Sequence, residues 1–168
     1  PNDVIAYREY ENLSFSWGEL ETPELQEQTV EEDRVWAVFG GYRFQFKNLK
    51  LLPKGYEPDE TNVILDADDI VWPLTIRSRE PGDRFIPSGM SNHKKLKHFF
   101  IDSKVPARLR DQVPIIADGN RILWVVGYRV DERALPRESS SKLLQIIVEP
   151  VDDRPKRMVR VKQKGKKQ

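Results

Sequence analysis

Basic side chains crowd the stretch from residue 77 to residue 110. Arginine presents a planar fork of N–H donors that fits phosphate oxygens, and lysine presents a mobile point charge. Such a set suits the backbone of a nucleic acid, because phosphate contacts dominate affinity and need no recognition of bases. The alternative for any single lysine is an ordinary solvated charge. The candidate phosphate-binding residues are Arg77, Arg79, Arg84, Lys94, Lys95, Lys97, His98, Lys104, Arg108 and Arg110.

Residues that could catalyse a reaction are scattered. His93 and His98 are the two histidines, and a separation of five does not place them on one helical face or complete a metal site. Ser88 and Ser91 could contribute to a Ser–His–Asp triad, so a small hydrolase is one hypothesis, but no motif aligns the three residue types. The phosphate-binding motifs Gly-x-x-x-x-Gly-Lys-Ser/Thr and Gly-x-Gly-x-x-Gly are absent. We therefore predict no catalytic residue and no metal site in this chain.

Asp83 lies in the Pro-Gly-Asp-Arg-Phe segment at 81–85 and allows two interpretations. As a functional residue it would be a lone carboxylate among arginines, whose charges keep it ionised and make it a poor general acid. As a structural residue it would bond turn amides, or pair with Arg79 or Arg110, and so hold the basic cluster in shape. We favour the structural role and predict that Gly82 and Asp83 form a turn.

A strand is expected to carry the first of these arginines. Polar and apolar residues alternate over 74–79, which predicts that Leu74 and Ile76 face the core. The same parity displays Arg77 and Arg79 from the opposite side of the strand.

Two short helices are expected to carry the remaining basic residues. In the segment 94–102, Leu96, Phe99 and Phe100 fall on one helical face, while the lysines and His98 fall mostly on the other. A second helix is expected over 106–112, because proline is tolerated in a first helical turn.

Further strands complete the expected fold. Gly40-Gly41 and Asp118-Gly119-Asn120 are hairpin turns. Trp124, Tyr128 and Phe85 could stack on bases, but Trp124 lies in an apolar segment, so core packing is favoured. The expected strands are 12–17, 35–39, 42–46, 49–52, 62–65, 114–117, 121–126 and 143–149.

Charge is divided unevenly along the chain. Residues 1–73 carry 16 acidic and 6 basic side chains, and residues 74–168 carry 11 acidic and 22 basic ones. This asymmetry favours a nucleic-acid or other acidic partner for the basic half, and the alternative is two solvated faces that attract each other across a domain interface. We predict an α+β fold. It comprises an acidic, mostly-β linking subdomain at 1–72, a basic module of antiparallel strands with two short helices at 73–150, and a basic flexible tail at 151–168.

Composition narrows the class of protein. Four Trp, five Tyr and seven Phe in 168 residues supply enough apolar area for a core. Cysteine is absent, which excludes disulfides and thiolate metal sites and fits a cytoplasmic location. The sequence contains no run of about 18 apolar residues, so it predicts no membrane-spanning helix. The chain begins with Pro1 rather than Met, so we expect a fragment of a longer protein.

Several motifs after residue 72 occur in a specific order and spacing. They are Pro-Leu-x-Ile-Arg-x-Arg at 73–79, Pro-Gly-Asp-Arg-Phe-x-Pro-x-Gly at 81–89, Lys-Lys-Leu-Lys-x-Phe-Phe-Ile-Asp at 94–102, Lys-Val-Pro at 104–106, Arg-Asp at 110–111, Pro114 and Trp-Val-x-Gly-x-Arg at 124–129. This pattern resembles the C-terminal region of bacterial tRNA(Ile)-lysidine synthases. The resemblance covers about residues 73–148.

The resemblance implies an accessory role in tRNA modification. The family's full-length ligase uses ATP, with Mg, to adenylate the wobble cytidine of tRNA(Ile), and lysine then displaces AMP to give lysidine. Catalysis in the family belongs to an N-terminal domain with a Ser-Gly-Gly-x-Asp-Ser loop. That motif is absent here, so this fragment is expected to be inactive alone and to hold no cofactor.

The implied partners are tRNA(Ile) and the enzyme's own N-terminal catalytic domain. The sequence leaves open whether the chain forms a homodimer. The ten candidate basic residues are then expected to contact the tRNA. An alternative from another class is a protein-interaction module whose acidic half docks on a basic partner.

Overall fold

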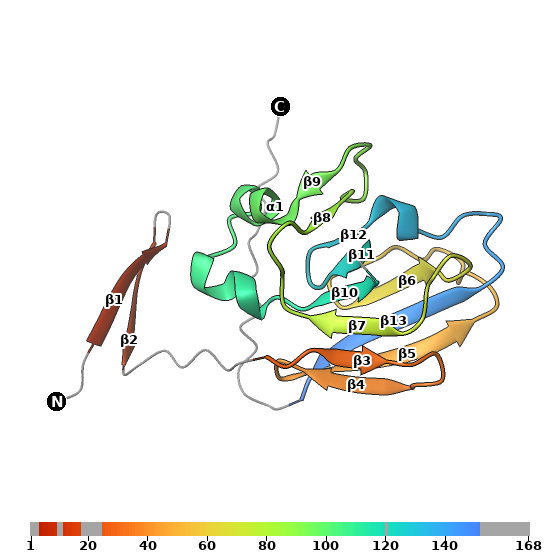
Figure 1. Cartoon of the computed structure of the whole chain (residues 1–168), viewed down its shortest axis with the longest axis horizontal. Coiled ribbons are helices and arrows are strands. Elements are labelled where there is room, and N and C mark those ends of the chain that lie inside the picture. Colours follow the sequence, from red (N-terminus) through yellow and green to blue (C-terminus); the bar gives the residue numbers. More distant parts are fainter. Residues whose placement is uncertain (1–3, 10–11, 18–24, 120, 152–168) are drawn as a thin grey trace.

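The computed structural model describes residues 4–9, 12–17, 25–119 and 121–151, as drawn in colour in Figure 1. At the N-terminal end, β1 (Val4–Glu9) and β2 (Asn12–Trp17) pair as an antiparallel hairpin. The expected strand at 12–17 is therefore confirmed. The predicted flexible tail lies outside the described residues, apart from Val151.

The first sheet has five antiparallel strands in the order β12-β11-β10-β7-β3. Apolar residues on both of its faces are buried, because packed layers lie above and below it. Its strands are β3 (Gln28–Val30), β7 (Leu74–Arg77), β10 (Ile115–Asp118), β11 (Arg121–Val125) and β12 (Arg129–Val130).

The second sheet has four antiparallel strands in the order β4-β5-β13-β6. Its first hairpin turns at Gly40 and Gly41, whose φ angles of 58° and 80° are accessible to glycine with little strain. Alternate residues of β5 are buried and exposed, as expected for a sheet with one solvated face. The strands are β4 (Trp36–Phe39), β5 (Tyr42–Leu49), β6 (Asn62–Asp66) and β13 (Leu143–Pro150).

The two sheets share one hydrophobic core. Phe44 and Ile146 from the second sheet and Ile76 and Trp124 from the first sheet belong to the same buried cluster. The expected burial of Trp124 is confirmed, since 1% of its surface is exposed.

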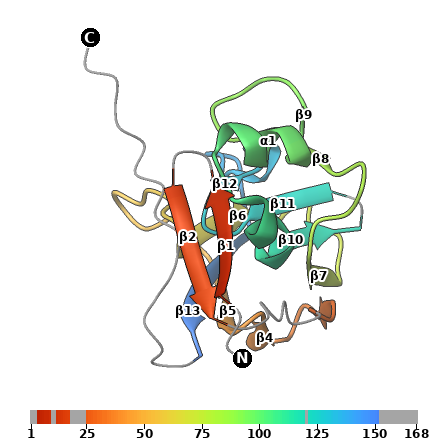
Figure 2. The same ribbon diagram turned by 90° about the vertical axis from the view of Figure 1, so that its left-hand side faces the viewer.

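A third layer covers the other face of the first sheet. It contains the ribbon of β8 (Arg84–Phe85) and β9 (Lys94–Lys95), the helix α1 (Leu96–Asp102) and the 3-10 helix η1 (Ala107–Gln112). In Figures 1 and 2, α1 and this ribbon lie above β10 and β11, and β4 and β5 of the second sheet lie below them. A separate cluster that includes Phe85, Phe99 and Phe100 joins this layer to the first sheet.

The antiparallel strands and the two short helices agree with the sequence-based prediction, and β sheets dominate the fold. A strand over 49–52 was wrong, because β5 ends at Leu49 and Leu51 and Leu52 are exposed. A short 3-10 turn, η2 (Glu132–Ala134), was not expected. No helix in the described part of the chain has the length and apolar character needed to cross a membrane.

The sheets do not separate at the expected boundary between residues 72 and 73. β13, from the predicted basic module, lies between β5 and β6 from the predicted acidic subdomain. β3 likewise pairs with β7 across that boundary. The division of the chain at residue 72 therefore stays a prediction about charge and function rather than about packing.

Candidate nucleic-acid interface

The basic surface begins where β7 ends, and its first arginine is not displayed to solvent. The Arg77 side chain is only 8% exposed, and its Nη1 and Nη2 atoms each donate to a carboxylate oxygen of Asp83 at 2.9 Å. Burial alone would lower the pKa of Arg77, but the hydrogen bonds and charge of Asp83 raise it above the ordinary value. The expected display of Arg77 from the strand is therefore wrong, because the side chain folds back onto the turn that follows.

Asp83 organises that turn. Its Oδ2 atom accepts from the backbone N–H of Glu80 at 2.7 Å, in addition to the guanidinium of Arg77. Gly82 has a φ of 90°, in the region that favours glycine. The arginine partner of Asp83 is thus Arg77 and not the expected Arg79 or Arg110.

Two more of the candidate residues form ion pairs with carboxylates. Arg79 Nε donates to Asp111 Oδ1 at 2.7 Å, which ties the end of β7 to η1. Lys94 Nζ lies 2.5 Å from Asp102 Oδ2, which ties β9 to the end of α1. Both side chains are about a quarter exposed, at 28% and 26%. In η1, Arg110 Nε donates to the backbone carbonyl of Val105 at 2.9 Å, and Arg108 is half-buried.

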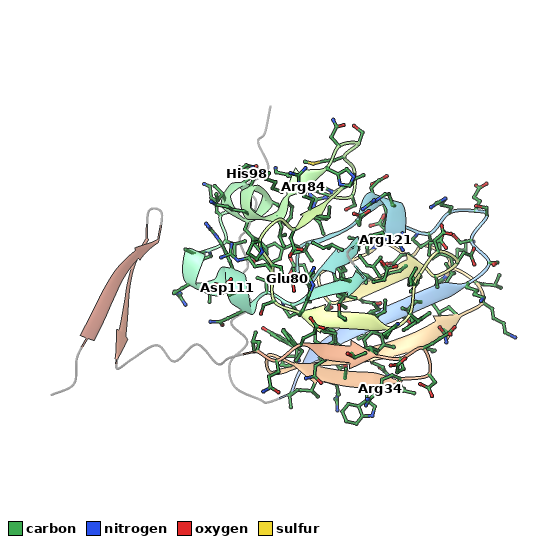
Figure 3. The ribbon with its side chains drawn as sticks, in the orientation of Figure 1. Arg34, Glu80, Arg84, His98, Asp111 and Arg121 are labelled. Atoms are coloured by element: carbon green, nitrogen blue, oxygen red, sulfur yellow. The ribbon has the colours of Figure 1, made fainter. Side chains whose placement is uncertain are left out.

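The remaining candidates form a row of exposed basic side chains on the third layer. We call this row the exposed patch, and none of its side chains makes a hydrogen bond or an ion pair with another described residue. It runs from β8 and β9 over α1 to the loop after it, and Figure 3 labels Arg84 and His98 within it. Its members are Arg84, Lys95, Lys97, His98 and Lys104.

Apolar packing beneath the exposed patch fixes its position. Leu96, Phe99 and Phe100 are the buried residues of α1, as the helical spacing predicted. The Phe99 ring meets Phe85 of β8 edge-on, with 5.0 Å between centroids. Because the ribbon and the helix share this cluster, the cations above it sit on one rigid unit.

Lys104 follows the end of α1 in an unusual backbone conformation. Its φ is 54°, and it is the one non-glycine residue with a positive φ in the described part of the chain. Its N–H donates to the carbonyl of Ile101 at 3.0 Å, which closes the helix end. Glycine is the usual residue at this position, because a Cβ atom is disfavoured there.

An open groove of about 880 Å³ adjoins the exposed patch through Arg84. The end of β7, the turn at 80–84 and the turn between β10 and β11 line it, and Figure 3 labels Glu80, Arg84 and Arg121 among its lining residues. Two of its arginines, Arg121 and Arg133, were not singled out from the sequence. Their local signal was an aspartate at or directly after the end of a strand, followed two or three positions later by an arginine, as in Asp-Gly-Asn-Arg and Asp-Glu-Arg.

These two arginines are held by buried carboxylates. Arg121 donates from Nε and Nη2 to Asp118 at 3.1 and 2.6 Å. Arg133 donates from Nε and Nη2 to Asp131 at 2.9 Å in both contacts. Burial would raise the pKa of Asp131, but hydrogen bonds from Arg133 and from the N–H of Ile86 lower it below the ordinary range.

Neither histidine belongs to a metal-binding arrangement. Within the residues that the structure describes, no group of three or more His, Asp or Glu side chains could hold a metal ion. His93 lines the groove, and His98 lies on the exposed side of α1.

The fold and the site together define a β-rich domain whose ribbon and helix present basic side chains that have no carboxylate partner among the described residues. This class of surface suits a polyanion. Residues 74–146 match a family model described as the TilS substrate C-terminal domain. A crystal structure described as that of a TILS C-terminal domain superimposes with a TM-score of 0.64 and 25% identity, covering 76% of this chain and 99% of that chain.

Similarity to several relatives extends beyond the matched domain. The bifunctional protein TilS/HprT of Listeria monocytogenes serovar 1/2a is 38% identical over 88% of this chain. The tRNA(Ile)-lysidine synthases of Geobacter sulfurreducens and Clostridium acetobutylicum are 34% and 39% identical over 80% and 89% of it. This chain spans 22%, 28% and 33% of the three relatives' lengths. Residues 74–146 of this chain belong to the family of C-terminal substrate domains of tRNA(Ile)-lysidine synthase.

Proposed function

We propose that this chain binds tRNA(Ile) as the accessory C-terminal region of a tRNA(Ile)-lysidine synthase. The observation that carries the proposal is the exposed patch, whose Arg and Lys side chains make no ion pair with any described residue. Cations that no carboxylate neutralises are available for phosphates, and each contact releases counterions from the RNA. The description of the family model as a substrate domain, together with tRNA(Ile) in the names of the relatives, supports tRNA as the ligand.

The candidate residues divide into two roles under this proposal. The exposed patch contacts phosphates directly, and Arg108 and Arg110 on η1 remain candidates for contacts at its edge. Arg77 acts as a positioning residue, because its hydrogen bonds to Asp83 fix the turn that carries Arg84. Arg79 and Lys94 contact RNA only if phosphates compete with Asp111 and Asp102 for them.

The rigid unit beneath the patch favours a structured RNA. A folded tRNA presents phosphates at fixed spacing, and cations on a packed ribbon and helix lose little conformational entropy when they meet it. The module at 73–150 would then have the main binding role, with 1–72 as the linking part and the tail at 151–168 as a minor contact.

The chemistry of lysidine formation is assigned to the rest of the synthase. Catalysis, ATP and Mg²⁺ would then belong to the N-terminal catalytic domain, because this chain lacks the pyrophosphate loop of the family. A tRNA substrate also supports a cytoplasmic location. The chain alone is expected to make no lysidine and hydrolyse no ATP.

A second surface favours a protein partner. Val35, Trp36, Val38 and Val151 are exposed apolar residues that line one shallow pocket on the solvated side of the second sheet. Apolar groups gathered in this way mark interaction sites more often than isolated ones do. We propose that this surface contacts the remainder of the synthase chain, since each of the three relatives is more than twice as long as this chain. Trp36→Ser in a full-length synthase should then weaken activity while leaving tRNA binding by this chain unchanged.

A binding titration tests the main proposal. The full 168-residue chain is titrated with tRNA and with duplex DNA at two salt concentrations. The Lys95→Ala/Lys97→Ala variant should weaken tRNA binding and flatten the log–log salt slope by roughly 0.7–0.9 for each lost contact. The Lys47→Ala/Lys50→Ala variant, which removes two exposed lysines outside the patch, is the matched control. Equal losses in both variants would mean that only net charge matters, and the patch would not be the site.

A further inference from the structure

Arg121 and Arg133 line the groove together with Arg84, yet the exposed patch does not include them. Each guanidinium is held along its Nε–Nη2 edge by a buried aspartate. The Nη1 atom of each donates no hydrogen bond to any residue in the described part of the chain. Each arginine therefore has a fixed orientation and unused N–H donors.

The aspartates have other donors besides these arginines. Asp118 Oδ2 accepts from the N–H of Val71 at 3.1 Å. Asp131 accepts from the N–H of Ile86 at 3.0 Å and from the N–H of Arg133 at 2.9 Å. Backbone donors therefore share the hydrogen bonding of the two buried carboxylates with the guanidinium groups.

The two arginines also lie close enough to influence each other. The hydrogen bonds that Arg121 donates to Asp118 raise the pKa of Arg121, whereas burial and the positive charge of Arg133 oppose that rise. Both guanidinium groups line the same groove, so an anion bound there would gain from the unused Nη1 donors of each.

We propose that Arg121 and Arg133 form a second phosphate-binding site, which takes a backbone phosphate of the same RNA that Arg84 contacts. The inference rests on the proposed tRNA binding and adds a site inside the groove. Arginines that are already oriented lose little entropy on binding, and their donors match phosphate oxygens. The groove volume of about 880 Å³ accommodates a nucleotide-sized group.

The test removes one Asp–Arg pair as a unit. The Asp118→Asn/Arg121→Gln variant leaves no unpaired buried charge and keeps an oxygen acceptor for the Val71 N–H. The matched control is Arg43→Gln/Glu149→Gln, which removes an exposed ion pair of 3.1 Å on the second sheet with the same change in charge. In titrations of the full chain with tRNA, the groove variant should bind about tenfold more weakly, the loss expected for one charge-assisted hydrogen bond. The control should bind as the parent does.

The outcomes separate this inference from the proposed function. A folded groove variant with parental affinity, alongside a weakened Lys95→Ala/Lys97→Ala variant, would overturn the groove site alone. If the parent itself fails to bind tRNA, both proposals fall. Thermal melting checks the fold of each variant.

A second measurement needs no substitution, in case the groove variant does not fold. The parent chain is treated with an arginine-specific reagent, with and without tRNA, and the modified residues are located by mass spectrometry. Binding should protect Arg121 and Arg133 at least as strongly as Arg84, and leave Arg43 unprotected. Unchanged modification of Arg121 and Arg133 in the presence of bound tRNA would overturn the inference.

Discussion

Arg84 and Lys95 lie directly opposite each other in the two-stranded ribbon of β8 and β9. Both side chains are exposed, and neither has a carboxylate partner among the described residues. Cβ atoms of directly opposed residues are about 4.5–5.5 Å apart, and like charges at that spacing destabilise a ribbon. A phosphate group placed between them would turn this repulsion into two favourable contacts.

Lys95→Glu should therefore separate stability from binding. The substitution converts the like-charge pair into an ion pair with Arg84, so the free energy of unfolding should rise by about 0.2–1 kcal/mol. Affinity for tRNA should fall further than in Lys95→Ala, because a negative charge is added beside the phosphate site. Urea unfolding and a tRNA titration on the same preparations measure the two effects. A Lys95→Glu variant that binds tRNA as tightly as the parent would contradict a role for the ribbon.

The aromatic residues of α1 should dominate the stability of the third layer. Phe100 is fully buried and Phe99 is nearly so, whereas Ile101 is 41% exposed. Phe100→Ala should lower the free energy of unfolding by about 3–5 kcal/mol, and Phe99→Ala by a similar amount. Ile101→Ala, on the same helix, should cost far less and serves as the control. Equal losses at Phe100 and Ile101 in urea titrations would show that burial does not explain the anchoring.

Lys104→Gly should stabilise the fold and weaken binding. Glycine relieves the cost of a positive φ of 54°, which is roughly 1 kcal/mol for a residue with a Cβ atom. It also removes one cation from the exposed patch. Lys104→Ala removes the same charge without relieving the backbone, so it should weaken binding and leave the melting temperature near that of the parent. If Lys104→Gly melts below Lys104→Ala, the backbone argument is wrong.

Acid should remove the stabilisation that Asp131 provides. Its folded-state pKa is held below the ordinary 3.8, because hydrogen bonds from Arg133 and backbone N–H groups outweigh the opposing effect of burial. A depressed carboxyl pKa contributes stability above the unfolded-state value, and that contribution is lost as the pH falls towards the folded-state value. The parent should thus lose more stability than Asp131→Asn between pH 5 and acid conditions near about pH 2. Parallel pH profiles for the two proteins would assign the acid sensitivity to other carboxylates.

The sequence alone determined the local elements of this protein. The spacing of Leu96, Phe99 and Phe100 predicted a helix with one buried face, and Gly40-Gly41 predicted the β4–β5 hairpin, because both patterns depend on residues a few positions apart. The motifs after residue 72 likewise identified the family, since their order and spacing are properties of the sequence itself.

Only the tertiary structure decided which charges are free and which segments pair. Arg77 alternates like a displayed residue, but it is buried against Asp83 because the turn at 80–84 brings the carboxylate to it. β13 pairs between β5 and β6, although it is far from both in the chain. Arg121 and Arg133 lie on separate turns, and the fold brings them to one groove. Hydrophobic periodicity indicates which face of an element is buried. It does not indicate which other element buries that face, or which charged side chain the fold brings next to it.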